Sequence, residues 1–189
     1  MIITKDEDAV SERFGDEVGY IQAPLSAENL QAAVAAALEG VEDEEGSVRE
    51  GYAKRASQAL LSLAARGADI SGAADNLALQ LNRGDEVSVP AAHAVGLAGG
   101  EDHLTALMGA LANGSGDLKK AASLAIGGIL GRMSTCPDSA AMGLMTAMDA
   151  ATDVELRLAL ATALGKAKIS AEQKLELIEK LARIAGSDS

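Results

Sequence analysis

The side chains that could bind a metal or transfer a proton are few and widely spaced in this chain. His93 and His103 are the two histidines and lie ten residues apart, whereas a zinc site on a helix pairs histidines about four residues apart. Cys136 is the single cysteine, and no general base lies near it in the sequence. We expect His93 to be a surface residue and Cys136 to lie in a loop or at a helix start. This pattern predicts no catalytic site, no bound metal and no cofactor.

Three methionines, Met142, Met145 and Met148, recur at three-residue steps. Methionine is flexible and can line a binding groove that adapts to its ligand. The same spacing also places the three side chains on one buried face of a helix. We favour the buried interpretation.

Charge is distributed unevenly along the chain. The net charge is −12, but residues 1–50 hold 13 acidic and 3 basic side chains (net −10), while residues 51–189 hold 15 and 13 (net −2). A phosphate-binding surface needs clustered lysine and arginine, so we expect no binding to nucleic acid. We expect no secretory signal, because the first residues lack a basic region and a long apolar run, and the sequence has no run of ~20 apolar residues. We therefore expect a cytoplasmic protein that does not bind membranes.

A repeated motif predicts the elements that carry these residues. The pattern small-or-apolar, small, any, Ala, aliphatic, Gly occurs at 91–96, 122–127 and 160–165, and residues 56–61 follow it without the glycine. The intervals of 35, 31 and 38 residues are typical of stacked helical hairpins. Alanine is about a fifth of the chain and aromatic residues only 2%, so neighbouring helices must approach closely through small side chains. The expected fold is an α-solenoid.

Residues that typically begin or end helices predict eight helices after the acidic N-terminal part. We expect them at residues 49–66, 71–82, 87–98, 101–112, 116–131, 138–150, 153–167 and 171–185. The assigned N-caps are Asp117, Asp153 and Ser170, and Gln173 completes a capping box with Ser170. These eight helices make about four hairpins.

Glycines are the expected helix stops, because glycine readily adopts the left-handed conformation that ends a helix. The assigned stops are Gly67, Gly84, Gly99, Gly100, Gly114, Gly131 and Gly186. Pro90 fits its helix only if that helix begins late, near Ser88, because an interior proline loses a hydrogen bond.

Two packing expectations follow from the apolar spacing. Ala94, Ala125 and Ala163 should lie where neighbouring hairpins come closest, so that a larger residue there would force the hairpins apart. In the last helix we expect a buried stripe opposite exposed ion pairs Glu176 to Lys180 and Glu179 to Arg183. The stripe consists of Leu175, Ile178, Leu181 and Ala185.

The segment 47–187 resembles a HEAT-type repeat array. The residues that carry the resemblance are Asp153, Leu156, Arg157, Leu160, Ala161, Ala163, Leu164 and Gly165, with Leu118, Lys119, Ala122, Ala125, Ile126 and Gly127 in the preceding copy. The resemblance implies a right-handed α-solenoid of about four hairpins that holds a protein or peptide. Lys119, Arg157 and Lys166 are the candidate contacts for that unknown partner.

The first forty residues follow a different pattern. We expect strands at 1–4 and 18–22 and helices at 8–14 and 26–38, an order that suggests a small βαβα unit. Thr4, Tyr20 and Pro24 resemble the hydroxyl, aromatic and proline positions at the end of a response-regulator receiver domain. Ala23 replaces the lysine of that family, which implies a degenerate or truncated receiver without phosphotransfer.

Residues 26–38 have a second interpretation, as the first helix of the first HEAT-like hairpin, paired with residues 51–66. Both interpretations leave the acidic residues 41–46 as a loop between helices. The N-terminal strands also offer a route to self-association.

Three functions remain open. The leading hypothesis is a non-enzymatic protein-interaction scaffold. The alternative is a regulatory module in which the receiver-like segment is coupled to the array. A third, which rests on the fold alone, is a HEAT-like bilin lyase.

Overall fold

The computed structural model describes residues 2–4, 20–22 and 46–187. Strands β1 (Ile2–Thr4) and β2 (Tyr20–Gln22) pair in parallel, with Ile2 opposite Tyr20 and Thr4 opposite Gln22. Thr4 and Tyr20 therefore lie at opposite ends of this two-stranded sheet. The expected helices at 8–14 and 26–38, the receiver-like positions Ala23 and Pro24 and nearly all of the acidic loop lie outside the described residues.

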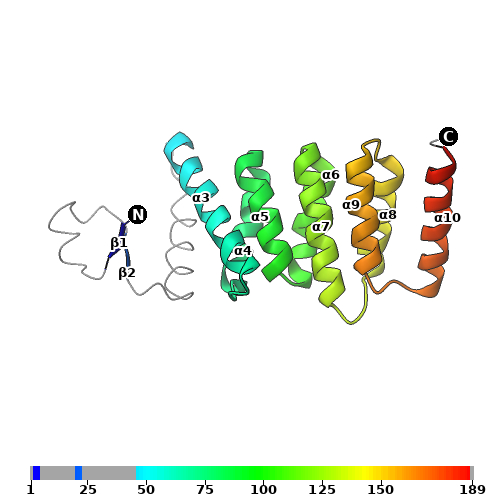
Figure 1. Ribbon diagram of the computed structural model, residues 1–189, viewed down its shortest axis with the longest axis horizontal. Helices are drawn as coiled ribbons and strands as arrows, with labels where there is room; N and C mark the ends of the chain where they lie inside the picture. The colour runs from blue at the N-terminus through cyan, green and yellow to red at the C-terminus, as the bar shows by residue number, and fades with distance from the viewer. Residues whose placement is uncertain (1, 5–19, 23–45, 188–189) are drawn as a thin grey trace.

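Residues 46–187 form helices joined by short connections, as expected (Figure 1). Short 3-10 helices precede or extend some of the α-helices: η2 (Ser71–Ala73), η3 (Gln80–Asn82) and η4 (Glu101–His103). The α-helices are α3 (Gly46–Ala65), α4 (Ala74–Leu79), α5 (Asp85–Ala98), α6 (Leu104–Asn113), α7 (Gly116–Arg132), α8 (Asp138–Ala150), α9 (Val154–Lys166) and α10 (Ala171–Ser187). Each expected helix is present within a few residues of its expected bounds. In the described part of the chain, no helix is both long and apolar enough to cross a membrane.

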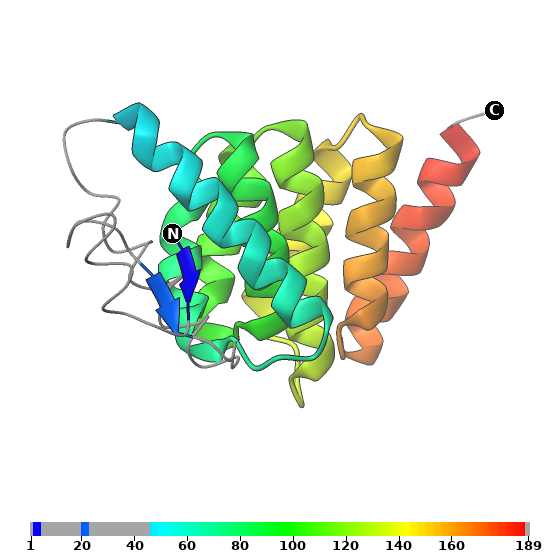
Figure 2. The ribbon, with the colours of Figure 1, turned by 60° about the vertical axis from the view of Figure 1, so that its left-hand side comes forward.

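The helices form two rows. Helices α3, α5, α7 and α9 lie side by side in what we call the front row, and α4, α6 and α8 lie behind them in the back row (Figures 1 and 2). Each back-row helix packs on the front-row helix that follows it in the chain. The core fills the space between the rows, and its largest fully buried side chains include Leu60, Leu77, Leu107, Ile126, Leu144 and Leu160.

Neighbouring front-row helices touch through glycine and alanine. A Cβ atom on Gly96 would lie 2.6 Å from Ala125 Cα, and one on Gly127 would lie 2.6 Å from Ala163 Cα. Real Cβ atoms do not approach so closely, so the backbones meet where the repeated motif places glycine. Ala125 and Ala163 are thus points of closest approach, as expected. A Cβ atom on Gly165 would have no packing neighbour within 4 Å, because within residues 46–187 no further helix continues the front row beyond α9.

Two of the three expected N-caps are present. Asp153 Oδ1 accepts a hydrogen bond from Glu155 N at 3.0 Å, and the Ser170 and Gln173 side chains form the expected reciprocal capping box. The assignment of Asp117 was wrong. Ser115 caps α7 instead, its Oγ accepting from Leu118 N at 3.1 Å, because the Asp117 backbone already lies within the first helical turn.

The glycine stops are only partly correct. Gly67 ends α3 with a φ of +84°, but Gly99 and Gly114 follow their helices in an extended conformation. Helices α7 and α10 continue through Gly131 and Gly186. In α7 the reason is a tertiary contact: the Arg132 guanidinium donates to the carbonyl oxygens of Gly96 and Gly99, at 2.8 and 2.7 Å.

Helix α5 begins at Asp85, so the expected start near Ser88 was wrong. Val87 N and Ser88 N both donate to Gly84 O, at 2.9 and 3.0 Å. The acidic first residues favour this early start, since carboxylates stabilise a helix N-terminus. Pro90 therefore lies inside the helix, and the Glu86 carbonyl lacks the donor that residue 90 would ordinarily provide.

The stripe expected to be buried on α10 is exposed at the three leucine and isoleucine positions, and the burial of Ala185 lies outside the described features. Leu175, Ile178 and Leu181 are 60%, 62% and 39% exposed. Helix α10 lies at the end of the array and contacts α8, where Lys180 pairs with Asp149 and, at 3.6 Å, with Glu176. No described helix covers its apolar side, which explains the exposure. Among the three methionines, Met145 and Met148 are buried as expected, whereas Met142 is 65% exposed.

Candidate interaction surface

A groove of about 530 Å³ runs across the solvent side of α3, α5 and α7. Its side chains recur at three- and four-residue steps, the spacing that keeps residues on one helix face. They are Lys54 and Gln58 from α3, Asp85, Glu86, Val89, Pro90 and His93 from α5, and Asp117, Lys120, Ala121 and Leu124 from α7. We call this feature the groove.

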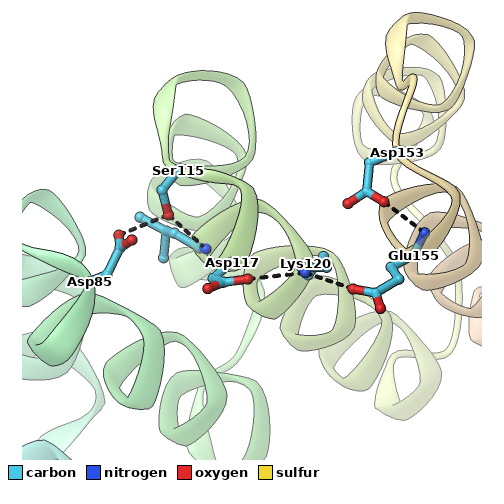
Figure 3. A network of polar contacts seen from close by, with 7 residues as sticks. Asp85, Ser115, Asp117, Lys120, Asp153 and Glu155 are labelled. Atoms are coloured by element: carbon cyan, nitrogen blue, oxygen red, sulfur yellow. Dashed lines mark hydrogen bonds and ion pairs between the residues drawn. The ribbon is translucent and has the colours of Figure 1, made fainter.

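Polar contacts connect successive front-row helices along the groove, and we call them the polar ladder. From α3 to α5, Lys54 Nζ lies 2.5 Å from Glu86 Oε2. From α5 to α7, Ser115 Oγ donates to Asp85 Oδ1 at 2.8 Å. From α7 to α9, Lys120 Nζ lies 2.8 Å from Glu155 Oε2 (Figure 3). Because Ser115 is also the cap of α7, one hydroxyl links the start of that helix to α5.

Acidic groups outnumber basic ones along the polar ladder. Lys120 pairs with Asp117 at 3.0 Å as well as with Glu155. The hydrogen bond to Glu155 is the largest cause of a raised pKa of Lys120, and the hydrogen bond to Asp117 is the next. Lys54 and Lys120 line the groove together with three carboxylates, those of Asp85, Glu86 and Asp117, while Glu155 binds Lys120 from α9. Two cations against three anions leave the groove lining net negative at neutral pH.

The floor of the groove is apolar. It is formed by Val89, Pro90, Ala121 and Leu124, and Leu124 is 37% exposed. His93 lies among them half-buried, and burial lowers the pKa of its imidazole, which favours the neutral form at pH 7. The expected surface histidine is therefore a groove residue.

The three candidate partner contacts do not come together. Lys119 lines a separate pocket of about 440 Å³ between α6 and α8. Arg157 is half-buried, and its Nε donates to Ala151 O at 2.7 Å, which ties α9 to the end of α8. Lys166 is exposed near the end of α9. The lysines that the groove does bring together, Lys54 and Lys120, were not predicted from the sequence.

A signal for the acidic edge was present in the sequence. Glu86, Asp117 and Glu155 are separated by 31 and 38 residues, the intervals of the Ala–aliphatic–Gly motif. Residues at the same place in successive repeats fall on neighbouring helices at the same height. A search for charges that share the period of the motif would have found this edge.

The remaining candidates for chemistry are a weakly nucleophilic thiol and a histidine held in local contacts, among them one at 3.1 Å from His103 Nε2 to Asp75 Oδ1. Cys136 lies in the loop before α8, as expected, and burial raises the pKa of its thiol, which makes it a weak nucleophile. His103 Nδ1 accepts from Gly100 N at 3.1 Å at the start of η4. Within residues 46–187, His, Cys, Asp and Glu form no cluster of three or more that could hold a metal ion.

In comparisons with known proteins, no family model matches the chain, and neither a curated protein nor a solved structure matches it.

Proposed function

We propose that the protein is a non-enzymatic, cytoplasmic interaction scaffold. In this proposal residues 47–187 form a HEAT-like, right-handed α-solenoid, and a protein or peptide binds in the groove of its front row. Two stacked rows of helices support the architecture. The observation that carries the function is the groove itself, where an apolar floor lies beside an acidic edge.

The front row exposes several large apolar side chains. Leu124 in the groove is 37% exposed, and Leu97 and Leu158 on neighbouring front-row helices are 48% and 68% exposed. Apolar side chains bordered by charged ones are typical of surfaces that bind other proteins. A partner that covers Leu124 would gain the free energy of removing this surface from water.

Affinity capture from native lysate, followed by mass spectrometry, tests the scaffold function with a matched pair of variants. Leu124→Asp places a charge on the groove floor, and Met142→Asp places the same charge on α8 in the back row, where Met142 is 65% exposed. We expect the wild-type and Met142→Asp proteins to capture the same partner proteins. The Leu124→Asp protein should fail to capture some of them. Circular dichroism confirms that both variants fold. Identical capture by all three proteins would contradict binding in the groove.

A second candidate is the regulatory module, favoured by the parallel pairing of β1 and β2. In this proposal the receiver-like segment associates with a second copy through its strands and controls access to the array. Ile3, paired with Ile21 within the chain, offers the test, because proline has no backbone N–H and disfavours a paired strand. We expect Ile3→Pro to convert a dimer to a monomer in light scattering. A wild-type monomer at high concentration would rule this candidate out.

A further inference from the structure

One lysine-to-carboxylate contact occurs at two junctions of the front row. Lys54 in α3 contacts Glu86 in α5, and Lys120 in α7 contacts Glu155 in α9. The two lysines are equivalent in the repeat, since the motif intervals of 35 and 31 residues lead from Lys54 to Val89 and on to Lys120. We call this place the lysine position.

The junction between α5 and α7 lacks this contact. Val89 occupies the lysine position of α5, so Asp117 in α7 receives no lysine from the preceding helix. Asp117 is 72% exposed, and its cation among the described residues is Lys120 of its own helix, which Glu155 shares. Asp117 and Glu155 therefore share one lysine, and among the described residues no lysine reaches Asp117 across its own junction, whereas Lys54 reaches Glu86 across the α3/α5 junction.

The groove includes this junction and extends to α3. Val89 and Asp117 both line it, together with Pro90 and Leu124. The absent lysine thus leaves an anionic side chain next to an apolar floor, in an open space of about 530 Å³. A cationic side chain of a partner could contact the Asp117 carboxylate. An apolar side chain next to it in the partner could then pack on the apolar floor.

We infer that the groove binds a partner segment carrying a lysine or arginine next to an apolar side chain. This inference rests on the proposed scaffold function and specifies its partner. The cation takes the place that Lys54 and Lys120 fill at the neighbouring junctions, and the apolar side chain packs on Val89, Pro90 and Leu124. The charge contact orients the segment, because an ion pair at an exposed site contributes direction and specificity more than affinity. The apolar contact contributes most of the binding free energy.

Substitution at the lysine position gives a matched set of variants. Val89→Lys supplies the absent cation from the protein itself. Val89→Met adds similar length without charge. Leu158→Lys adds the same charge at the equivalent place in α9, where Leu158 is 68% exposed and lies outside the groove.

Peptides selected from a displayed random library on the full-length wild-type chain, then measured by isothermal titration calorimetry, test the inference. We expect the selected peptides to contain lysine or arginine beside an apolar residue and to lose about tenfold in affinity when that cation is replaced by methionine. Val89→Lys should bind about tenfold or more weakly than Val89→Met, which carries a side chain of similar length without the charge, whereas Leu158→Lys should bind like wild type. Peptides without basic residues, or peptides that Val89→Lys binds as tightly as wild type, would overturn the inference.

Thermal melting provides a readout that needs no peptide. If Val89 stands where a lysine reaches Asp117, Val89→Lys should melt above Val89→Met at low salt, and the difference should shrink at high salt. Equal melting temperatures at low salt would count against the geometry. Failure of the peptide selection alongside Leu124-dependent capture from lysate would remove the basic partner and leave the scaffold function standing. Leu124-independent capture would instead remove the groove as the binding surface of the scaffold.

Discussion

At the junction of α7 and α9, Gly127 lies against Ala163, and Lys120 pairs with Glu155 across the surface. At the junction of α5 and α7, Gly96 lies against Ala125 in the same way, but the surface contact is the hydrogen bond from Ser115 to Asp85. The buried part of the repeat is thus copied, while the surface part is not. The difference leaves Asp117 beside an open groove.

This contrast separates two roles of the repeated sequence. Alanine and glycine determine how closely the helices approach, because a Cβ at either glycine would lie 2.6 Å from the facing Cα. The residues one or two turns away, which point to solvent, determine what the surface can bind. Variation is tolerated at the second set of positions since it costs little packing energy.

The buried glycine–alanine contacts predict equal and large losses of stability at the two junctions. Gly96→Ala and Gly127→Ala each force apart a pair of helix backbones, and we expect each to lower the free energy of unfolding by about 1 to 3 kcal/mol or more. Gly165→Ala is the control, because nothing lies within 4 Å of a Cβ there, and it should raise stability by up to about 1 kcal/mol. Urea denaturation measures all three. A destabilising Gly165→Ala, or a neutral Gly127→Ala, would contradict the shared contact.

The α5/α7 junction has one further contact of its own, the Arg132 guanidinium. It donates to Gly96 O and Gly99 O at 2.8 and 2.7 Å. We expect Arg132→Ala to cost about 1.5 to 3 kcal/mol, because it removes charged hydrogen bonds to two carbonyls at the end of α5. Arg132→Lys should recover only part of the loss, since lysine lacks the planar fork that reaches both carbonyls. Full recovery by lysine in urea denaturation would show that charge alone matters there.

Local signals in the sequence predicted the helices well. The bounds expected for the helix at residues 138–150 agree with α8 in the structure. Gly131 misled because Arg132 extends α7 through a contact with residues more than thirty positions away. The apolar stripe on α10 was wrongly predicted to be buried. Amphipathicity shows that a helix has an apolar side, but it does not show that another helix covers that side.

The candidate site was harder to predict than the fold. Lys119 and Arg157 were chosen because they match a family pattern, yet Lys119 points to the α6 and α8 side of α7 while its neighbour Lys120 points to the groove. One residue along a helix changes direction by about 100°. Choosing between the two lysines therefore required knowing how α7 is rotated about its axis within the row. The motif alone did not provide that orientation.

His93 should make the α5 side of the groove sensitive to pH. Burial lowers the pKa of its imidazole below 6.5 in the folded protein, so the unfolded chain binds a proton that the folded chain does not. Stability should therefore fall as pH drops below about 6.5. Leu124 in α7 occupies the position in the repeat that His93 occupies in α5. The variant His93→Leu therefore gives both helices the same residue there. We expect the variant to gain stability relative to wild type as the pH falls from 7 toward 5, measured by thermal melting, and a constant difference would contradict the buried neutral histidine.

The smallest effect should come from the α7/α9 surface contact. Lys120→Met removes the ion pairs with Glu155 and Asp117, but exposed ion pairs contribute little to stability. We expect a slight decrease in melting temperature at low salt that vanishes at high salt. Because these contacts raise the pKa of Lys120, their contribution is complete below the ordinary lysine pKa of 10.5 and is lost only as the pH rises beyond it. A salt-independent loss comparable to that of Gly127→Ala would mean that Lys120 helps to hold α9 in the row, and the division between buried spacing and variable surface would fail at this junction.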